Sequence, residues 1–510
     1  MPSDSSQEEV AVETMEEEQN KEDKQMKDDQ YRLGGQPALK TLLKLMIGPL
    51  ISQLVAAFYG LVDSMWVAKA LGTQGVSAVS LFTNLDNIGR AFGFFLNCAA
   101  TAKISSMIGE KRQKEAGQIL CDLFRMCFVC GAIVPALILP IAKPLAKWFG
   151  SNEKTTSWGF AYLSVLMGCS VFTCIFLFGC GLLQGEGRTF LVGIMQLVSF
   201  ILNMCVFDPL FLLGFKVGIA GAAIATILAE AIPGIIILVL YFCGKFSIKP
   251  SFKELFKPFA RESFSAMSVG FSQLFANLAQ SLPGILVRKY LGMISQNMDN
   301  GNFDQAMAGF NGVIRIFGIT NSFRLATTMS LLPSASFAHS AKRNRRMLFL
   351  FIHASWLNLA WGLFTFTLST AWPDKISMVI SSNPDYIAWA APMLKAANFD
   401  AIHAWVRFLC QTLLQALRYG LVATIYSLFA TLGANMAMST ALYFTNKKDQ
   451  IRLMYTYPLT SAVSMVVGIF IAFICWLKEK KKENEQKNNQ DENQNEIVVE
   501  DDDQEVVDSL

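Results

Sequence analysis

Twelve apolar runs, each long enough to cross a membrane as a helix, constrain this chain more than any other feature. A helix needs about 20 residues to span the hydrocarbon core of a bilayer. The runs cover residues 42–68, 76–102, 117–142, 158–180, 190–214, 218–243, 264–290, 306–332, 346–371, 386–413, 419–444 and 456–477. They lack the two-residue alternation of a transmembrane β-barrel and the polar faces that a water-soluble core needs on its outer helices. The pattern predicts an all-α membrane protein with twelve transmembrane helices.

The charged residues are concentrated at the two ends of the chain. Only 16% of the 510 residues are charged and 53% are hydrophobic, whereas soluble domains have roughly a quarter charged. The ends hold too few apolar residues to offset the entropy lost on ordering. We therefore expect a disordered acidic tail over 1–36 and a disordered charged tail over 478–510. The N-terminal segment also lacks the apolar core of a cleavable signal peptide.

Basic residues gather in the loops on one side of the predicted helices. Clusters of Lys and Arg follow runs 2, 6, 8 and 12, and the opposite loops carry fewer. The loop with Lys447, Lys448 and Arg452 is an exception to this trend. Positive loops face the cytoplasm, so we expect a multi-pass integral membrane protein with both termini cytoplasmic. The sequence leaves open whether it lies in the plasma membrane or an internal one.

The chain repeats itself weakly at about half its length. SNEKTTSW at 151–158 and SNPDYIAW at 382–389 share their first two residues and their last, at a shift of 231 (382 − 151). The same shift superposes Lys111 and Arg112 on the Lys-Arg pair that begins at Lys342. These matches fall at corresponding points of a six-helix unit, which predicts two halves related by a pseudo-two-fold axis along the membrane normal. Accidental matching among loops of similar composition is the alternative.

A basic linker joins the two predicted halves. The halves cover 37–243 and 264–477, and the linker covers 244–263. Within the linker, five cations recur every four residues with Phe residues between them, and Pro250 and Pro258 would break a helix. Both a segment that lies on the membrane and an ordinary basic cytoplasmic loop fit this pattern.

Several stretches resemble the multidrug and toxic compound extrusion (MATE) transporters. GLVDSMWVAKALGTQGVSAVS (60–80) resembles the end of that family's first span, and SSMIGEKRQKEAGQIL (105–120) resembles its loop after span 2. The strongest resemblance is at 182–226, with a Gly-rich turn, an Asn–Asp-Pro-Leu fifth span and GIAGAAIAT in the sixth. The second half is similar more loosely, through Arg315 and the repeat. The resemblance covers 37–477 and implies a secondary antiporter that exports amphipathic, often cationic organic compounds in exchange for H⁺ or Na⁺ by alternating access.

Two aspartates within the spans are the first candidates for ion coupling. A carboxylate inside a membrane span costs several kcal/mol, so each one needs a role or a partner. Burial disfavours the charged form of Asp63 and Asp208, and two such groups close together would titrate as a pair. In the family, matching positions form one polar cluster of the N-terminal half, which by resemblance includes Asp63, Asp208 and Thr226. Asp208 could instead cap a helix before Pro209.

The asparagine of that family cluster does not fit the usual spacing. It is expected four residues before the aspartate, a position that Met204 occupies, whereas Asn203 lies five residues before Asp208. Either a local helix irregularity brings Asn203 to the same face, or the network is built differently.

Other polar residues suggest weaker sites. Asp400, His403 and Arg407 follow i, i+3, i+7 spacing, and they form either a second cation site or a charge-neutral structural triad. Asp86 and Arg90, four residues apart, are expected to neutralise each other. The acids are not duplicated between the halves, so we expect the first half to sense the ion and a cavity between the halves to hold substrate. Polar residues that could line that cavity are Gln184, Gln273, Asn277 and Glu230.

Several function classes lack their residues in this sequence. No P-loop is present, the three His share no metal-ligand spacing, and no catalytic constellation converges, so we expect neither an enzyme nor a metal site. We expect no cofactor beyond the coupling ion, no nucleic-acid partner, and a monomer whose partners are organic small molecules and the lipid bilayer. A flippase for a lipid-linked saccharide is the alternative, because such a cavity is cationic and the spans contain Arg90, Arg315, Arg324 and Arg407.

Overall fold

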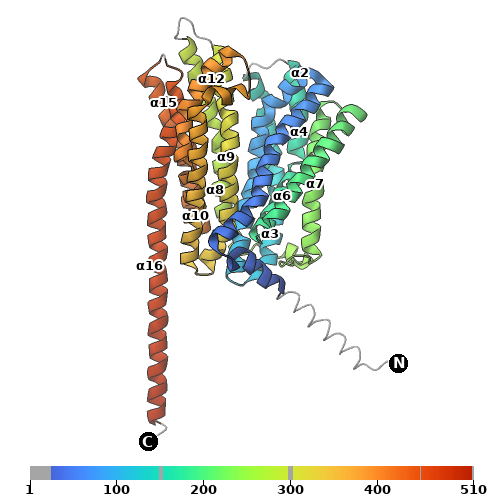
Figure 1. Cartoon of the computed structure of the whole chain (residues 1–510). Coiled ribbons are helices and arrows are strands. Elements are labelled where there is room, and N and C mark those ends of the chain that lie inside the picture. The colour runs from blue at the N-terminus through green and yellow to red at the C-terminus, as the bar shows by residue number, and fades with distance from the viewer. Residues whose placement is uncertain (1–23, 149–152, 297–302, 448, 508–510) are drawn as a thin grey trace, which may run out of the picture.

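The computed structural model describes residues 24–148, 153–296, 303–447 and 449–507, and these residues form an all-helical bundle. Figure 1 shows the helices of the first half beside those of the second, with α16 (Thr456–Val507) extending well beyond the bundle. The described N-terminal residues, the linker and the far end of α16 lie at the same end of the bundle (Figure 1), which we call the linker end. An even number of crossings places both ends of a chain on one side.

The first half contains long helices and two irregular ones. Helix α2 holds the first two spans and is interrupted at Gly72, where φ is +70°. Glycine adopts this conformation without steric cost. Helices α4 and α5 meet at an angle of 52° and together form the fourth span. The elements of this half are α2 (Ala38–Gly109), η2 (Gln113–Glu115), α3 (Ala116–Trp148), α4 (Glu153–Gly168), α5 (Ser170–Gly185), α6 (Thr189–Ile201), η3 (Leu202–Phe207), η4 (Pro209–Gly214) and α7 (Ile219–Phe242).

The second half follows the same order. Its fourth span is again interrupted, here by the short turn η6, and its fifth again contains a π-helical stretch, η7. The elements are α8 (Arg261–Gln296), α9 (Phe303–Ser340), α10 (Asn344–Ala371), α11 (Pro373–Met378), α12 (Pro384–Ala397), η6 (Asn398–Ile402), α13 (Ala404–Ala416), α14 (Gly420–Leu428), η7 (Phe429–Gly433), α15 (Ala434–Thr445), η8 (Arg452–Tyr455) and α16. Between the halves, the linker forms one 3₁₀ turn, η5 (Phe252–Phe256), bounded by its two prolines.

Each of the twelve predicted runs corresponds to a helix or to a pair of interrupted helices. Among the described residues, eight helices are long and apolar enough to cross a membrane, or nine when the bent α4–α5 pair is counted as one span. Helices α8 and α9 fall outside that group because they carry more polar side chains, such as Gln273, Asn277 and Arg324. Helices α12 and α13, of 14 and 13 residues, are each too short to cross alone.

Unusual backbone dihedral angles repeat between the halves at the shift that the sequence shows only weakly. Lys111 and Lys342 both have positive φ angles, 59° and 54°, and so do Gly187 and Arg418, 73° and 64°. The shift of the sequence repeat relates the two members of each pair (342 − 111 and 418 − 187). Positive φ is uncommon in residues other than glycine, so a recurrence at the predicted shift argues against accidental matching.

Parts of both terminal segments are helical in the structure. Residues 1–23 of the expected acidic tail and 508–510 lie outside the described residues, but 24–35 are helical and Leu33 is buried. At the other end, α16 extends through Val507. Glu, Lys and Gln are good helix formers, and ion pairs at i, i+4 add to that propensity. One such pair in α16 is Lys481–Glu485, whose charged atoms are 3.8 Å apart.

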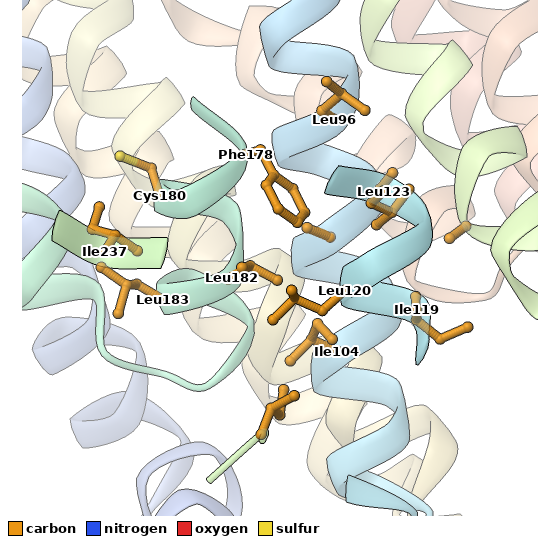
Figure 2. Packing of buried hydrophobic residues seen from close by; sticks show 14 of the residues in the cluster. Leu96, Ile104, Ile119, Leu120, Leu123, Phe178, Cys180, Leu182, Leu183 and Ile237 are labelled. Carbon is orange, nitrogen blue, oxygen red and sulfur yellow. The ribbon is translucent and has the colours of Figure 1, made fainter. Parts of the chain in front are cut away.

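Among the described residues, buried apolar side chains form four clusters, of which two lie within one half each and two combine residues of both halves. In the first half, α5 lies at the centre, with fourteen of its sixteen residues buried. Figure 2 shows its Phe178 and Leu182 beside Leu96 and Ile104 of α2 and Leu120 of α3. Close approach of the helices fixes this arrangement, because a Cβ on Gly48 of α2 would lie 1.7 Å from the carbonyl oxygen of Thr189 in α6. The first half therefore offers a packed frame for the polar groups buried within it.

Candidate functional site

Asp63 and Asp208 lie buried within the first half. Asp63, in α2, is 7% exposed, and Asp208, between η3 and η4, is fully buried. The π-helical segments on either side of Asp208 pack against α2, the helix that holds Asp63. Among the described residues, Asp63 Oδ1 and Asp208 Oδ2 have no hydrogen-bond partner. A buried carboxylate oxygen without a donor is costly, so this pair can be stabilised by taking up a proton or a small cation.

A π-helix brings Asn203 to Asp208. Residues Leu202–Phe207 form η3, and the backbone N–H of Asp208 donates to the carbonyl of Asn203, five residues earlier. In a regular α-helix, residues five apart are rotated by roughly 140° from each other. In η3 they share a face, and Asn203 Nδ2 donates to Asp208 Oδ1 over 3.3 Å. The structure thus contains the irregularity that the spacing required, and π-helical turns are frequent at functional sites.

The structure shows no side-chain hydrogen bond for the alternative role of Asp208 as a helix cap. Asp208 is the N-cap residue of η4, but its side chain makes no capping hydrogen bond. Its described side-chain hydrogen bond is the one from Asn203. The carboxyl group therefore points toward the polar cluster of the first half.

Thr226 lies on a helix that packs against η3, and Tyr59 lies on the same helix as Asp63. Thr226 is buried in α7, which packs against η3, and its hydroxyl donates to the carbonyl of Ala222 over 3.1 Å. Tyr59 lies one turn before Asp63 in α2, and the charges of both aspartates act on its hydroxyl, which has no described partner. Sequence reasoning missed Tyr59, although its i, i+4 spacing to Asp63 was a usable signal.

An ion-pair network beside the aspartates lies across α2, α5 and α7, and the charges of its members Asp86 and Arg90 act on Asp63. Arg90 donates to Asp86 over 3.0 Å, as the four-residue spacing predicted, and also to Glu230 over 2.7 Å. The second oxygen of Glu230 accepts from the hydroxyl of Thr173 over 2.6 Å. Glu230 was expected only as a cavity-lining group, and the structure shows it instead as the buried partner of a cation. Thr173 was not anticipated.

The second predicted site is arranged differently from the expected helix face. The turn η6 interrupts the helix at Asp400, so i, i+3, i+7 spacing does not align the three side chains. Asp400 accepts hydrogen bonds from Ser461 and, over 3.4 Å, from Arg324. The ring of His403 pairs with the carbonyl oxygen of Pro458 at 2.8 Å.

Arg407 is not part of an ion pair with that aspartate. Its guanidinium lies 4.7 Å from the ring centroid of Phe408, and none of the ion pairs among the described residues includes it. The surroundings of Asp400 thus hold two arginines, Arg324 and Arg407, against one carboxylate. The predicted triad becomes an Asp400–Arg324–Ser461 cluster with an additional cation nearby.

The four residues proposed to line a central cavity are dispersed. Gln184 accepts a hydrogen bond from Thr101 over 3.3 Å at the end of α5, and Glu230 is engaged by Arg90. Asn277 donates to the backbone carbonyl of Gln273 within α8 over 3.0 Å. Of these four residues, Gln273 and Asn277 are the pair for which the described residues show a contact.

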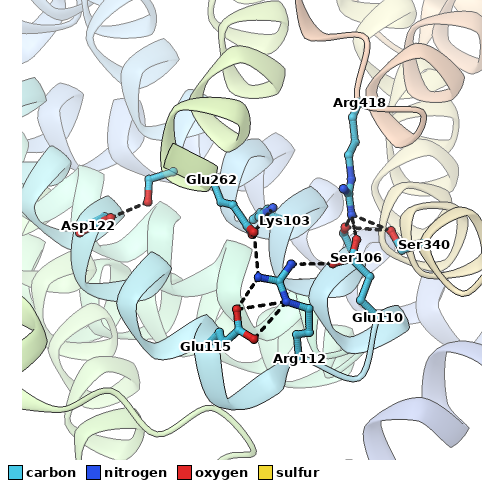
Figure 3. Close-up of polar contacts among 10 residues, drawn as sticks. Lys103, Ser106, Glu110, Arg112, Glu115, Asp122, Glu262, Ser340 and Arg418 are labelled. Carbon is cyan, nitrogen blue, oxygen red and sulfur yellow. Dashed lines mark hydrogen bonds and ion pairs between the residues drawn. The ribbon is translucent and has the colours of Figure 1, made fainter. Parts of the chain in front are cut away.

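The two halves are joined by ion pairs at the linker end. Figure 3 shows this set of contacts, which we call the seam. Glu262 of α8 pairs with Lys103 and Arg112, each at 2.8 Å. Arg418 of the second half donates to Glu110 and to Ser106, whose hydroxyl is 2.8 Å from that of Ser340. Ion pairs between the halves thus gather in the seam, and the structure is closed at the linker end.

The electrostatics of Glu262 make the seam dependent on pH. Burial of Glu262 favours its neutral form, but hydrogen bonds and charge from Lys103 and Arg112 outweigh burial and hold the pKa of Glu262 below its usual 4.5. Glu262 is therefore ionised at neutral pH, and its pairs with the first half are intact.

The segment before α2 also bridges the halves. Arg346, in the second half, donates to the backbone carbonyls of Leu33 and Gln36 over 3.1 and 2.7 Å. On the other side, Arg188 of the first half lies 3.6 Å from Asp29. These contacts explain why residues 24–35 are ordered despite their polar composition.

Comparisons with known proteins follow the same division into halves. The MatE family model matches residues 49–209 and 275–440, one segment in each half. Multidrug export protein MepA of Staphylococcus aureus (strain MSSA476) is 20% identical over 408 residues, which cover 79% of this chain and 87% of MepA. A multidrug resistance MATE family transporter of the MOP superfamily, solved in an outward-facing conformation, matches with a TM-score of 0.78 and 18% identity over 89% of this chain and 98% of that one.

A further solved structure shows the same fold. A MOP superfamily transporter from Pyrococcus furiosus, described as having a binding pocket of reverse polarity, matches with a TM-score of 0.77 and 18% identity over 88% of this chain and 97% of that one. Because the family is one of transporters, the expectation that the chain is not an enzyme is confirmed. The chain belongs to the MATE family and is a multi-pass membrane transporter with the twelve-helix, two-half fold of that family.

Proposed function

We propose that this transporter is an antiporter that exports amphipathic, often cationic organic compounds in exchange for H⁺ or Na⁺, with ion coupling in the first half. The observation that carries the proposal is the buried pair Asp63–Asp208, whose free carboxylate oxygens contrast with the engaged ones of Asp400 and Glu230. The name of MepA, a multidrug export protein, supports export of organic compounds.

The chemistry of the pair suits an exchangeable ion. A proton or Na⁺ that binds between Asp63 and Asp208 removes their mutual repulsion, and Asn203 keeps one oxygen of Asp208 oriented. Release of the ion restores two charges in an apolar setting, which is unfavourable unless the surroundings rearrange. A rearrangement of α2 against η3 would then change how the halves approach each other, because α2 also packs against α8 and α9 of the second half.

Alternating access requires the seam to open, and its more exposed ion pairs are weak enough for that, whereas the pair of Glu262 with Lys103 involves a buried cation. Arg112 and Glu262 are each more than a third exposed, and Arg418 is 36% exposed. Exposed ion pairs contribute about 0–1 kcal/mol each. The Arg90–Glu230 pair, whose carboxylate is buried, holds α2 to α7 within one half and does not need to break. We propose that the halves, 37–243 and 264–477, move as units, that the chain acts as a monomer and that both termini are cytoplasmic.

Transport by the purified chain in proteoliposomes tests the coupling assignment. We expect a pH or Na⁺ gradient to drive ethidium movement in the wild type and in Asp400→Asn, but not in Asp208→Asn. Asp400→Asn is the matched control, because it removes one buried aspartate from the other half. Loss of gradient-driven transport in Asp400→Asn, with transport by Asp208→Asn intact, would place coupling in the second half instead.

A lipid-linked saccharide flippase is the second candidate. The observation that favours it is the excess of cations near Asp400, where Arg324 is 2% exposed and its Nε has no described partner. Such a group could receive a substrate phosphate. Absence of ethidium movement under both gradients, together with movement of a fluorescent lipid-linked saccharide, would favour this function.

A further inference from the structure

An apolar groove crosses the boundary between the halves near the linker. Its volume is about 730 Å³, and it is lined by Met126 of α3 in the first half, by Phe264, Phe271 and Phe275 of α8, and by Leu421 of α14. The three Phe rings and Leu421 are exposed at its surface. Aromatic and aliphatic side chains from both halves thus form one continuous apolar wall that faces outward from the bundle.

Two cations of the linker flank a residue that lines this groove. Phe259 is both a linker residue and part of the groove wall, and the guanidinium of Arg125 lies 4.3 Å from its ring centroid. Arg125 also donates to the backbone carbonyl of Lys257 over 2.8 Å, so the linker is held against α3. Two residues that flank Phe259 closely, Lys257 and Arg261, have exposed side chains.

The linker also exposes aromatic rings to the surroundings of the bundle. Phe256 is 89% exposed and Phe252 is 68% exposed. In water such exposure is unfavourable, whereas a segment with exposed Phe and Lys side chains suits the boundary between lipid headgroups and acyl chains. Of the two interpretations of the linker, its structure favours the one that lies on the membrane.

We propose that the groove binds an acyl chain of an anionic glycerophospholipid, with the lipid phosphate held by Lys257 and Arg261. The apolar wall matches the chain, and the adjacent cations match the phosphate and the net negative charge of the headgroup. Because the wall includes Met126 of the first half and α8 and α14 of the second, a bound lipid bridges the halves beside the seam. The lipid therefore stabilises the conformation that is closed at the linker end.

Lipid binding to the purified full-length chain tests this site. Native mass spectrometry would compare phosphatidylglycerol with phosphatidylcholine of the same acyl chains. We expect wild type to prefer phosphatidylglycerol, and Lys257→Gln/Arg261→Gln to bind it at least about tenfold more weakly, since each cation near an anionic lipid contributes about fivefold. The control Lys111→Gln/Lys114→Gln removes two exposed cations from another loop at the linker end and should bind like wild type.

Two further experiments test whether the groove itself holds the lipid, and one of them does not depend on the folding of the charge variant. Thr424→Trp fills the groove wall from α14 and should weaken binding of both lipids. Excess inorganic phosphate should not displace the lipid if the groove, and not the charge alone, holds it. Equal binding of the two lipids by wild type, unchanged phosphatidylglycerol binding in the Lys257/Arg261 variant, or displacement by phosphate would each overturn the proposal. If the charge variant does not fold, the wild-type preference and Thr424→Trp decide.

Discussion

Replacement of Arg90 by Leu should destabilise the first half strongly. The substitution leaves Glu230, whose side chain is 5% exposed, without its cation, and it also removes the partner of Asp86. Loss of one member of a buried ion pair costs about 3–5 kcal/mol, because the remaining charge stays buried and uncompensated. Thr173 still donates to Glu230, but one hydroxyl cannot replace a guanidinium. The expected loss in free energy of unfolding is therefore about 3–5 kcal/mol.

The double variant Arg90→Leu/Glu230→Leu separates the pair from its individual members. It removes both charges of the pair and should recover most of the lost stability, because apolar replacements of buried pairs are often neutral. Equilibrium unfolding in mixed micelles would measure all variants. Lys481→Leu is the control, since it breaks an exposed pair, and such pairs are worth no more than about 1 kcal/mol. A loss below about 1 kcal/mol for Arg90→Leu, or a double variant as unstable as the single one, would refute this reasoning.

Three further predictions concern the aspartate pair, the packing of the first half and the seam. Asn203→Leu removes the donor to Asp208 and should impair gradient-driven transport without loss of folded protein, as judged by size-exclusion chromatography; full transport would argue against a role for this hydrogen bond. Gly48→Ala should cost at least about 1–3 kcal/mol in thermal unfolding, because its Cβ meets the backbone of α6, whereas Gly284→Ala, with no atom within 4 Å, should be tolerated. Since the pKa of Glu262 lies below 4.5 in the folded chain, its pairs stabilise the closed seam above that usual value and weaken as the pH falls through the lower pKa. Spin labels across the seam should then move apart, and an unchanged distance at low pH would contradict this.

Features set by local sequence were predictable. Long apolar runs must be helices in a bilayer, because no other conformation except a closed barrel satisfies the backbone there, and all twelve runs are helical. The weak repeat at a shift of 231 (342 − 111) also indicated real duplication, since Lys111 and Lys342 adopt the same unusual backbone conformation. The i, i+4 pair Asp86–Arg90 formed for the same local reason.

Features set by tertiary contacts were not predictable from one sequence. Glu230 lies 140 residues from Arg90 in the chain, and no spacing rule links them. The sequence indicated that a helix irregularity is needed to align Asn203 with Asp208, but it did not show that this irregularity is a π-helical turn at Leu202–Phe207. The prediction that Asp400, His403 and Arg407 share one helix face assumed a regular helix, whereas the helix is interrupted at Asp400.

Packing of the segment before α2 was underestimated for a related reason. Composition alone indicates disorder, but the segment that contains Leu33 is held by arginines from both halves, Arg188 and Arg346. These partners lie far along the chain from the segment that they hold, and composition does not record such contacts. In α16, intrinsic helix propensity continues the last span beyond the apolar residues.

Ethidium efflux from cells that express the wild type or Asp63→Asn, under imposed pH and Na⁺ gradients, tests the central claim most directly. The account predicts that one gradient drives efflux in the wild type and that Asp63→Asn, correctly inserted in the membrane, exports no dye under either gradient. Efflux by Asp63→Asn equal to that of the wild type would contradict the assignment of ion coupling to the buried aspartates of the first half.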